Sequence, residues 1–222
     1  MINIDSLELS YGVDGFRLSI PRLKIENAEK VAIIGASGSG KTTLLKLISG
    51  IIKPQQGLIT IGGIVINKLS DVECRDYRIS NIGFIFQDFE LLDYLNVQDN
   101  ILHPFRITKS LSIDHHVRER MKRLAEEMGI VDKLKRYTTN LSQGEKQRAA
   151  ICRAMVTMPK IILADEATGN LDPSNKIKIL DALFQSADKN KATLIAVTHD
   201  HELLERFDRV IDFKQFCGVG AV

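Results

Sequence analysis

The stretch at residues 35–43 restricts the possible folds of this chain more than any other, because its spacing suits very few structures. It follows a short apolar run at 31–34 and precedes a helix-like run at 44–48. The pattern G-x-x-x-x-G-K-T between a strand and a helix is typical of a phosphate-binding P-loop. An ordinary glycine turn before a helix would not require this spacing. The predicted phosphate-contacting residues are Gly35, Ala36, Ser37, Gly38, Ser39, Gly40, Lys41, Thr42 and Thr43.

The chemistry of a phosphate site explains these residue types. Glycines let backbone N–H groups approach phosphate oxygens without a Cβ clash, and the helix N-terminus adds a positive dipole end. Lys41 is expected to reach the β- and γ-phosphates of a nucleotide. Thr42 is expected to offer its hydroxyl to Mg²⁺.

Composition places the chain among ordinary globular proteins. Its 222 residues can bury one core, and 44% are hydrophobic and 26% charged. The net charge of +2 gives no reason to expect a nucleic-acid partner. No apolar run approaches the ~18 residues of a membrane span, and no secretory leader is visible. The widely spaced Cys74, Cys152 and Cys217 are interpreted as reduced thiols of a cytosolic protein.

Apolar strands alternating with helices predict an α/β fold with a mainly parallel core sheet and an N-terminal antiparallel β subdomain. Strands are expected at 2–10, 16–25, 30–34, 58–61, 64–66, 82–86, 161–164, 193–197 and 208–212. Helices are expected at 41–51, 143–157, 173–187 and 201–206.

Residues 88–140 lack strand-like runs and predict an inserted α-helical subdomain. The chain is expected to form a single domain over 1–222, in which 1–87 and 141–222 make the catalytic core. Apolar residues from 113 to 128 fall on one helix stripe, which leaves His115 and His116 on the exposed side. These two histidines are either a solvated helix face or, less in keeping with their position, metal ligands.

Polar residues follow three of the buried strands. Asp165 and Glu166 end one strand. Because successive strand residues point to opposite sides, the two carboxylates can have different roles. Asp165 is expected to hold Mg²⁺, and Glu166 to polarise the attacking water. His199 ends another strand and is expected at the same sheet edge, where it would contact the γ-phosphate. Gln87 ends a third and could reach Mg²⁺ or the water, unless it is a simple strand-end amide.

A second anion site is predicted at the start of the helix near residue 143. Ser142 and Glu145 fit the capping box S-x-x-E. The Ser142 hydroxyl can accept from the helix and still donate to a phosphate, beside Gln143 and Gly144.

Together these segments resemble the nucleotide-binding subunit of ATP-binding cassette (ABC) transporters, a P-loop NTPase fold, over nearly the whole chain. The resemblance implies that Tyr11 stacks on adenine, although an aromatic residue in a turn can equally be plain packing. It also implies that Gln87 is the Q-loop residue and His199 the switch histidine. The matching motif segments are Walker A (35–43), the signature (141–145), Walker B (161–166) and the D-loop (167–172).

Two departures from the family pattern stand in these motifs. Gln143 replaces a signature glycine and Glu145 stands where Gln is common, while Ser142 and Gly144 are kept. Ala167 replaces a frequent proline after Glu166, and little effect is expected. The run Gly-Asn-Leu-Asp at 169–172 is similar to the lipoprotein-releasing, macrolide-exporting and cell-division ATPases of the LolD, MacB and FtsE types.

The resemblance implies an ATPase that uses ATP and Mg²⁺ and powers a membrane exporter or mechanotransmission complex. A non-transport regulator of the cell-division type is the alternative. Two copies would sandwich two ATP molecules, with Lys41, Glu166 and His199 in one chain facing Ser142 and Gly144 of the other, and Asp172 linking the sites. Separate permease subunits would hold the pair on the cytoplasmic face of the membrane.

Overall fold

A parallel sheet forms the centre of the computed structural model, which describes residues 1–12, 16–167 and 173–216. Within the described chain, its strand order is β6-β7-β8-β3-β9. Every pair in it is parallel, and Asp165 of β7 lies opposite Val197 of β8. The strands are β3 (Lys30–Ile34), β6 (Ile82–Ile85), β7 (Ile161–Asp165), β8 (Thr193–Val197) and β9 (Arg209–Asp212).

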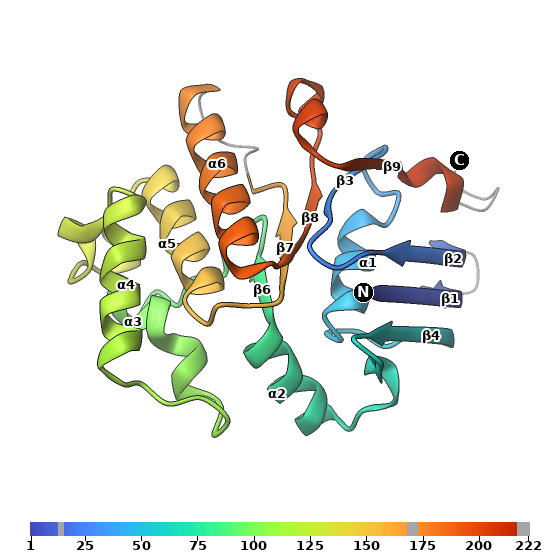
Figure 1. The fold of residues 1–222 in the computed structure, drawn as a ribbon, viewed down its shortest axis with the longest axis horizontal. Helices are drawn as coiled ribbons and strands as arrows, with labels where there is room; N and C mark the ends of the chain where they lie inside the picture. Colours follow the sequence, from blue (N-terminus) through green and yellow to red (C-terminus); the bar gives the residue numbers. More distant parts are fainter. Residues whose placement is uncertain (13–15, 168–172, 217–222) are drawn as a thin grey trace.

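A second, antiparallel sheet lies beside the first, at the right of Figure 1. Its strand order is β2-β1-β4-β5. The strands are β1 (Ile2–Ser10), β2 (Arg17–Ile25), β4 (Gln56–Ile61) and β5 (Ile64–Val65). The prediction of a parallel core with an N-terminal antiparallel sheet is therefore confirmed.

The helices lie on both sides of the parallel sheet (Figure 1). Helix α1 lies between the two sheets, whereas α3, α4, α5 and α6 lie on the opposite side. The α-helices are α1 (Lys41–Ile48), α2 (Asp71–Asn81), α3 (Val97–Leu102), α4 (His115–Glu127), α5 (Gln143–Met155) and α6 (Pro173–Asn190). Short 3₁₀ helices are η1 (Ile66–Lys68), η2 (His103–Arg106), η3 (Val131–Lys133), η4 (Thr138–Asn140), η5 (His201–Arg206) and η6 (Phe213–Phe216). Among the described residues, no helix is both long and apolar enough to cross a bilayer.

Strand alternation divides the core into two clusters. Ile161 and Leu163 of β7 belong to the cluster with α1 and the antiparallel sheet. Ile162 and Ala164 belong to the cluster with α3, α4, α5 and α6. Successive strand residues point to opposite faces, so a sheet covered on both sides needs apolar residues at every position.

The structure differs from the sequence prediction at helix α2 and at several helix ends, since α5 ends at Met155 and α6 at Asn190. Helix α2 was not predicted, although Ser70 and Glu73 form a complete capping box at its start. Its sequence is mostly polar and buries little beyond Cys74, so a hydrophobic stripe could not indicate it. Helix α1 ends at Ile48 rather than at residue 51, because Gly50 adopts a left-handed φ of 64°.

The described chain between β6 and α5 contains helices and one isolated bridge, between Asn96 and Tyr137. His115 and His116 are exposed and lie beside Glu119, with donor atoms within 4.8 Å of one another. Their exposure agrees with a solvated helix face.

A buried amide holds the loop after β6 against α3. Asn100 is 0% exposed. Its Oδ1 accepts from the Leu92 N–H at 2.8 Å, and its Nδ2 donates to the Leu92 carbonyl at 3.0 Å. The same Nδ2 lies 3.2 Å from the Leu95 carbonyl and 3.1 Å from that of Asn96. One side chain therefore hydrogen-bonds several backbone groups of residues that lie outside helices and strands.

We expect Asn100→Ala to lower the free energy of unfolding by about 2–4 kcal/mol, because it leaves buried backbone groups without partners. Denaturant unfolding measures this change. Gln98→Ala, in the same helix but only partly buried, is the control and should change stability by less than about 0.5 kcal/mol. Equal effects of the two substitutions would contradict this role of Asn100.

Candidate functional site

The loop after β3 folds around the Lys41 side chain. Lys41 is 5% exposed, and its Nζ donates to the carbonyls of Gly35 at 2.9 Å and Ala36 at 2.8 Å. Gly38 and Gly40 have left-handed φ values of 76° and 103°, which favour glycine. The loop therefore closes into a ring of backbone groups with one cation at its centre.

An aromatic side chain closes the other side of this loop. A Cβ on Gly40 would lie 2.4 Å from Cζ of Phe16, so the two residues are in close contact. Phe16 lies 6.2 Å from Tyr11, ring centre to ring centre, and Tyr11 is 51% exposed. Both rings line the same cleft as the loop. Sequence reasoning selected Tyr11 and missed Phe16, which reads as an ordinary inward strand residue.

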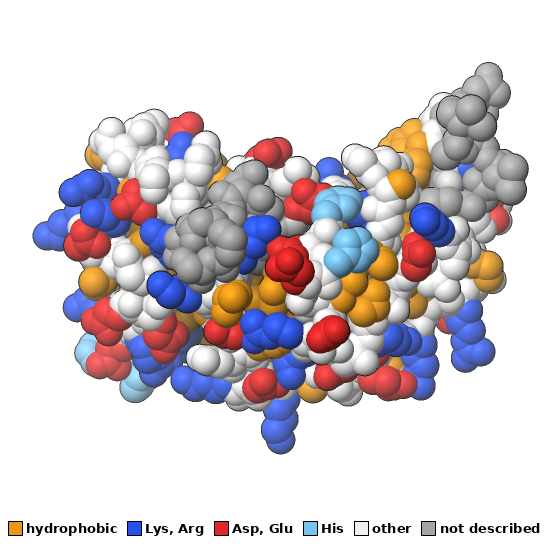
Figure 2. Space-filling view, turned by 90° about the horizontal axis from the view of Figure 1, so that it is seen from above, with side chains coloured by type: hydrophobic (Ala, Val, Ile, Leu, Met, Phe, Trp, Pro, Cys, Tyr) orange, Lys and Arg blue, Asp and Glu red, His pale blue; other side chains and the backbone are white. Residues whose placement is uncertain are grey.

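The cleft measures about 470 Å³ and gathers residues that follow β3, β6, β7 and β8, together with Tyr11 and Phe16 beside β1 and β2 of the antiparallel sheet. This volume is within the usual range for a small-molecule site. Figure 2 looks onto this edge of the molecule and shows histidine and acidic side chains near its middle. The lining residues are Tyr11, Phe16, Ser37, Gly38, Gly40, Lys41, Thr42, Thr43, Gln87, Glu166 and His199.

Asp165 is a buried carboxylate with spare bonding capacity. It is 3% exposed, and its Oδ1 has no hydrogen-bond partner among the described residues. Burial raises the pKa of Asp165, the Thr42 hydroxyl bonded to it lowers this pKa, and the charge of Glu166 raises it again. A buried oxygen without a partner beside a threonine hydroxyl fits a hard divalent cation.

Glu166 and His199 form a pair at the ends of β7 and β8. Nε2 of His199 lies 2.8 Å from Oε1 of Glu166. Glu166 has a left-handed φ of 49°, and its N–H donates to the Val197 carbonyl at 3.1 Å. That conformation is unfavourable for a residue with a Cβ. The turn points the carboxylate out of the sheet edge towards the cleft.

The predicted anion site at α5 lies apart from this cleft. Ser142 caps α5, accepting from the Glu145 N–H at 3.3 Å, while Oε2 of Glu145 accepts from the Ser142 N–H at 2.8 Å. The predicted capping box is therefore confirmed. Ser142 and Gln143 are exposed and Gly144 is half-buried, and none of the three lines the cleft. Asp172 falls outside the described residues.

A family model described as ABC transporter matches residues 18–169. The chain belongs to the ABC transporter family. This confirms the resemblance drawn from the motifs.

Curated relatives of this ABC protein cover most of its length. It is 42% identical over 194 residues to the bacitracin export ATP-binding protein BceA of Halalkalibacterium halodurans, covering 86% of this chain and 75% of the relative. It is 36% identical over 206 residues to the lipoprotein-releasing system ATP-binding protein LolD of Legionella pneumophila, covering 93% of this chain and 86% of the relative.

A solved ABC cassette has the same fold. The dimeric post-hydrolysis structure of the ATP-binding cassette MJ0796, bound to ADP and Pi, matches with a TM-score of 0.89 and 31% identity. The match covers 96% of this chain and 94% of the other. The present chain is thus an ABC ATPase with an α/β P-loop fold.

A residue of α5 that sequence reasoning missed supports the segment that follows β7. Gln147 is 2% exposed, and its Nε2 donates to the carbonyl of Ala167, the residue after Glu166. Gln147 lies on the buried side of α5, just after the signature. Its local sequence gives no sign of this contact. Gln147 therefore ties the signature helix to the backbone beside Glu166.

We expect Asp165→Asn to raise the free energy of unfolding of the ligand-free chain by about 1 kcal/mol at neutral pH, because it removes a buried charge. Because the pKa of Asp165 is raised in the folded state, its negative charge destabilises the fold at pH values above that pKa. The stability gained by the substitution is therefore complete above the folded-state pKa. It is lost below the unfolded-state pKa, where the carboxyl is protonated in both states. Denaturation of both proteins across pH measures the difference. Glu205→Gln, at an exposed carboxylate of η5, is the control and should leave stability nearly unchanged. A gain of the same size at acidic pH would contradict this account.

Proposed function

We propose that the chain hydrolyses ATP as the nucleotide-binding subunit of a membrane exporter, and that the residues of the cleft carry the reaction. The observation that carries this proposal is the Glu166–His199 pair, which faces the Lys41 loop across one cleft. Relatives whose names refer to bacitracin export and lipoprotein release favour export. Those names support a peptide, lipoprotein or drug-like cargo.

The loop and the two rings bind the nucleotide in this proposal. Backbone N–H groups of the residues from Gly35 to Thr43 surround the β- and γ-phosphates, with Lys41 as their counter-charge. Lys41 then exchanges its bonds to the Gly35 and Ala36 carbonyls for bonds to phosphate oxygens. Tyr11 and Phe16 provide the stacking surface for adenine at the outer end of the cleft.

Mg²⁺ fits the oxygen atoms beside the loop. The Oδ1 of Asp165 has no hydrogen-bond partner within the described part of the chain, and the Thr42 hydroxyl lies against the same carboxylate, so both can serve as ligands, directly or through water. Gln87 supplies a further amide oxygen from the end of β6. When bound, the ion neutralises charge on the β- and γ-phosphates.

Glu166 and His199 position the attacking water. The Glu166 carboxylate accepts a hydrogen bond from the water and polarises it, and His199 holds that carboxylate in place from 2.8 Å. His199 also reaches the γ-phosphate. Because phosphoryl transfer depends mainly on positioning and charge stabilisation, these rigid strand ends supply most of what the reaction needs.

We expect Glu166→Gln to keep ATP binding and to lose turnover by about 100-fold or more, because the amide cannot polarise the water. Phosphate release measures turnover, and fluorescent-nucleotide titration measures binding. The variant should also accumulate as an ATP-bound dimer in gel filtration. Glu202→Gln, at an exposed carboxylate near His199, is the matched control. Wild-type turnover in Glu166→Gln would remove Glu166 from the mechanism.

The complete site requires a second chain. Ser142, Gln143 and Gly144 lie outside the cleft of their own chain, on the exposed end of α5. We place them over the nucleotide of a second copy, where the N-terminus of α5 meets the γ-phosphate. The dimeric form of the MJ0796 cassette supports this arrangement. Asp172 is assigned to the link between the two sites.

Ser142→Arg is expected to abolish hydrolysis while the monomer still binds ATP, because the arginine blocks the partner's nucleotide and leaves the chain's own cleft unchanged. Mixing Ser142→Arg chains with Lys41→Ala chains should restore activity. Each mixed dimer has one intact site, made of Lys41 from the first chain and Ser142 from the second. Phosphate release from the mixture measures the rescue. Hydrolysis by Ser142→Arg alone, or no rescue on mixing, would show that Ser142 does not act on a partner's nucleotide.

The permease would dock beside the loop after β6. An open pocket of about 230 Å³ there is lined largely by apolar side chains, among them Ile79, Phe86 and Ile107. Arg153 of α5 donates to the carbonyls of Phe89 and Glu90, whose φ values of 63° and 50° are left-handed. A change in the position of Gln87 would thus be transmitted to this pocket and to α5 together.

Such docking would keep the ATPase on the cytoplasmic face of the membrane, in keeping with the reduced Cys74 and Cys152. The division into a core and a helical subdomain over 88–140 would let the second part follow the permease.

A further inference from the structure

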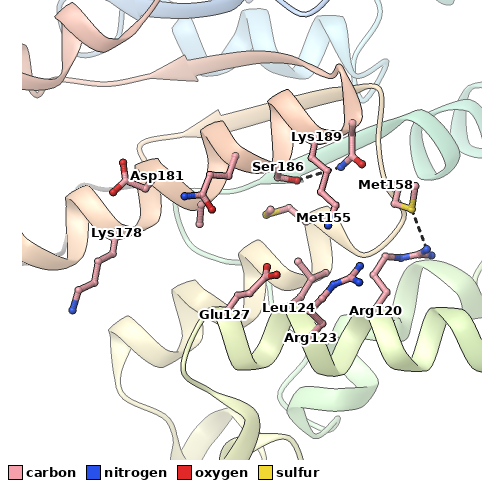
Figure 3. A pocket seen from close by; sticks show the side chains of 13 residues that line it. Arg120, Arg123, Leu124, Glu127, Met155, Met158, Lys178, Asp181, Ser186 and Lys189 are labelled. Atoms are coloured by element: carbon pink, nitrogen blue, oxygen red, sulfur yellow. Dashed lines mark hydrogen bonds between the residues drawn. The ribbon is translucent and has the colours of Figure 1, made fainter.

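A second large groove lies between α4 and α6 (Figure 3). Its volume is about 550 Å³. Residues of α4, of α6 and of the segment around the end of α5 line it, and Figure 3 shows side chains of α4 and α6 pointing into the space between the two helices. None of its 13 lining residues lines the nucleotide cleft. The groove is therefore a separate feature of the surface.

Both walls of the groove carry cations. Arg120 and Arg123 come from α4, and Lys178 and Lys189 come from α6. The two lining acids are Glu127 and Asp181, and Asp181 already pairs with Arg206 outside the groove. For Arg123, Lys178 and Lys189 there is no ion pair with any described residue. In a chain whose net charge is only +2, this groove concentrates unneutralised positive charge.

One of these cations is fixed in place by the groove floor. Nε of Arg120 donates to the Val156 carbonyl at 2.6 Å, and its guanidinium lies 3.0 Å from the Met158 sulfur. Burial lowers the pKa of Arg120, Asp114 raises it, and the neighbouring Arg123 lowers it again. The like charge of Arg123 therefore lies close enough to Arg120 to act on it, with Asp114 as the opposing charge.

The floor between the cations is apolar. Leu124 and Met155 are 8% and 4% exposed, and Met158 is 50% exposed. Met158 also has a left-handed φ of 54°. Exposed methionine adapts to different apolar surfaces and is common where proteins bind helices.

The distribution of charge favours an extended ligand. Lys178 and Lys189 are eleven positions apart on α6, or about 16 Å along the helix axis. One phosphate could not contact both. Nucleic acid would match the cations but would leave the apolar floor uncovered. An amphipathic helix of about 12 residues spans this length, and it can place apolar side chains on the floor and acidic ones against both walls.

We propose that the α4–α6 groove is a docking site for an acidic amphipathic helix of a partner protein. The helix lies between α4 and α6, with its apolar face on Leu124, Met155 and Met158. Its carboxylates pair with Arg123 and Lys189 across the groove. This assignment does not rest on the proposed export function, because the groove and the cleft share no residue.

The test uses the whole protein and a fluorescein-labelled helical peptide that carries leucine on one face and glutamate on the others. Fluorescence anisotropy measures binding at low and at high ionic strength. We expect the wild-type chain to bind this peptide, and a matched peptide with lysine in place of glutamate to bind about tenfold more weakly or not at all. Binding should weaken as salt rises.

A charge-reversal pair locates the binding. Arg123→Glu with Lys189→Glu should weaken binding of the acidic peptide roughly tenfold or more. Arg118→Glu with Lys122→Glu makes the same change of charge at exposed α4 positions outside the groove, and binding should be nearly unchanged. Both double variants should keep wild-type ATP hydrolysis and melting temperature, which shows that they fold.

Three results would overturn the proposal. The first is no binding of the acidic peptide by the wild-type chain. The second is equal weakening by the two double variants, which would mean a diffuse charge effect. The third is tighter binding of single-stranded DNA with the same dependence on Arg123 and Lys189, which would assign the groove to nucleic acid instead.

Discussion

The parallel hydrogen-bonded ladder of β6, β7, β8 and β3 is the constraint on which the rest of this molecule depends. In a parallel sheet, all carboxyl ends lie on one edge. The ladder continues past the strands, since the Glu166 N–H donates to the Val197 carbonyl and the Thr198 N–H to the Ile33 carbonyl. These two bonds set the backbone beside Glu166 and His199. The 2.8 Å contact between their side chains follows from that register.

Helix α5 connects the parts that this edge brings together. Its first turn presents Ser142, its middle holds the Ala167 carbonyl through Gln147, and its last turn holds the loop after β6 through Arg153. Burial lowers the pKa of Arg153 to about 10, which leaves it charged at neutral pH and fit to hold two carbonyls. One rigid helix therefore touches the segments that would sense a partner chain, a reacting phosphate and a membrane subunit.

Unfavourable backbone conformations occur where these contacts meet. Glu166, Phe89 and Glu90 all have left-handed φ values, each costing about 1–3 kcal/mol for a residue with a Cβ. The Val197 carbonyl accepts from the Glu166 N–H, Arg153 donates to the Phe89 carbonyl, and the Asn100 amide oxygen accepts from the Leu92 N–H. The groove between α4 and α6 shares no lining residue with the cleft, although Met155 at the end of α5 lines it.

Local sequence determined the parts that depend on short spacing. The glycine loop at 35–43, the capping box at Ser142 and the apolar strands follow from steric and hydrogen-bonding rules that act over a few residues. The same rules predicted the α/β class and placed Asp165, Glu166 and His199 at strand ends. The sequence did not predict helix α2, because the helix buries few side chains. Its capping box was the signal that could have indicated it.

Only the tertiary structure decided which distant residues touch. It placed Phe16 against Gly40, Gln147 against Ala167 and His199 against Glu166, and it left Ser142 outside its own cleft. It also assembled the α4–α6 groove from helices that are far apart in the chain. Each of these contacts depends on sheet register and helix packing, which bring together residues whose local sequence carries no sign of one another.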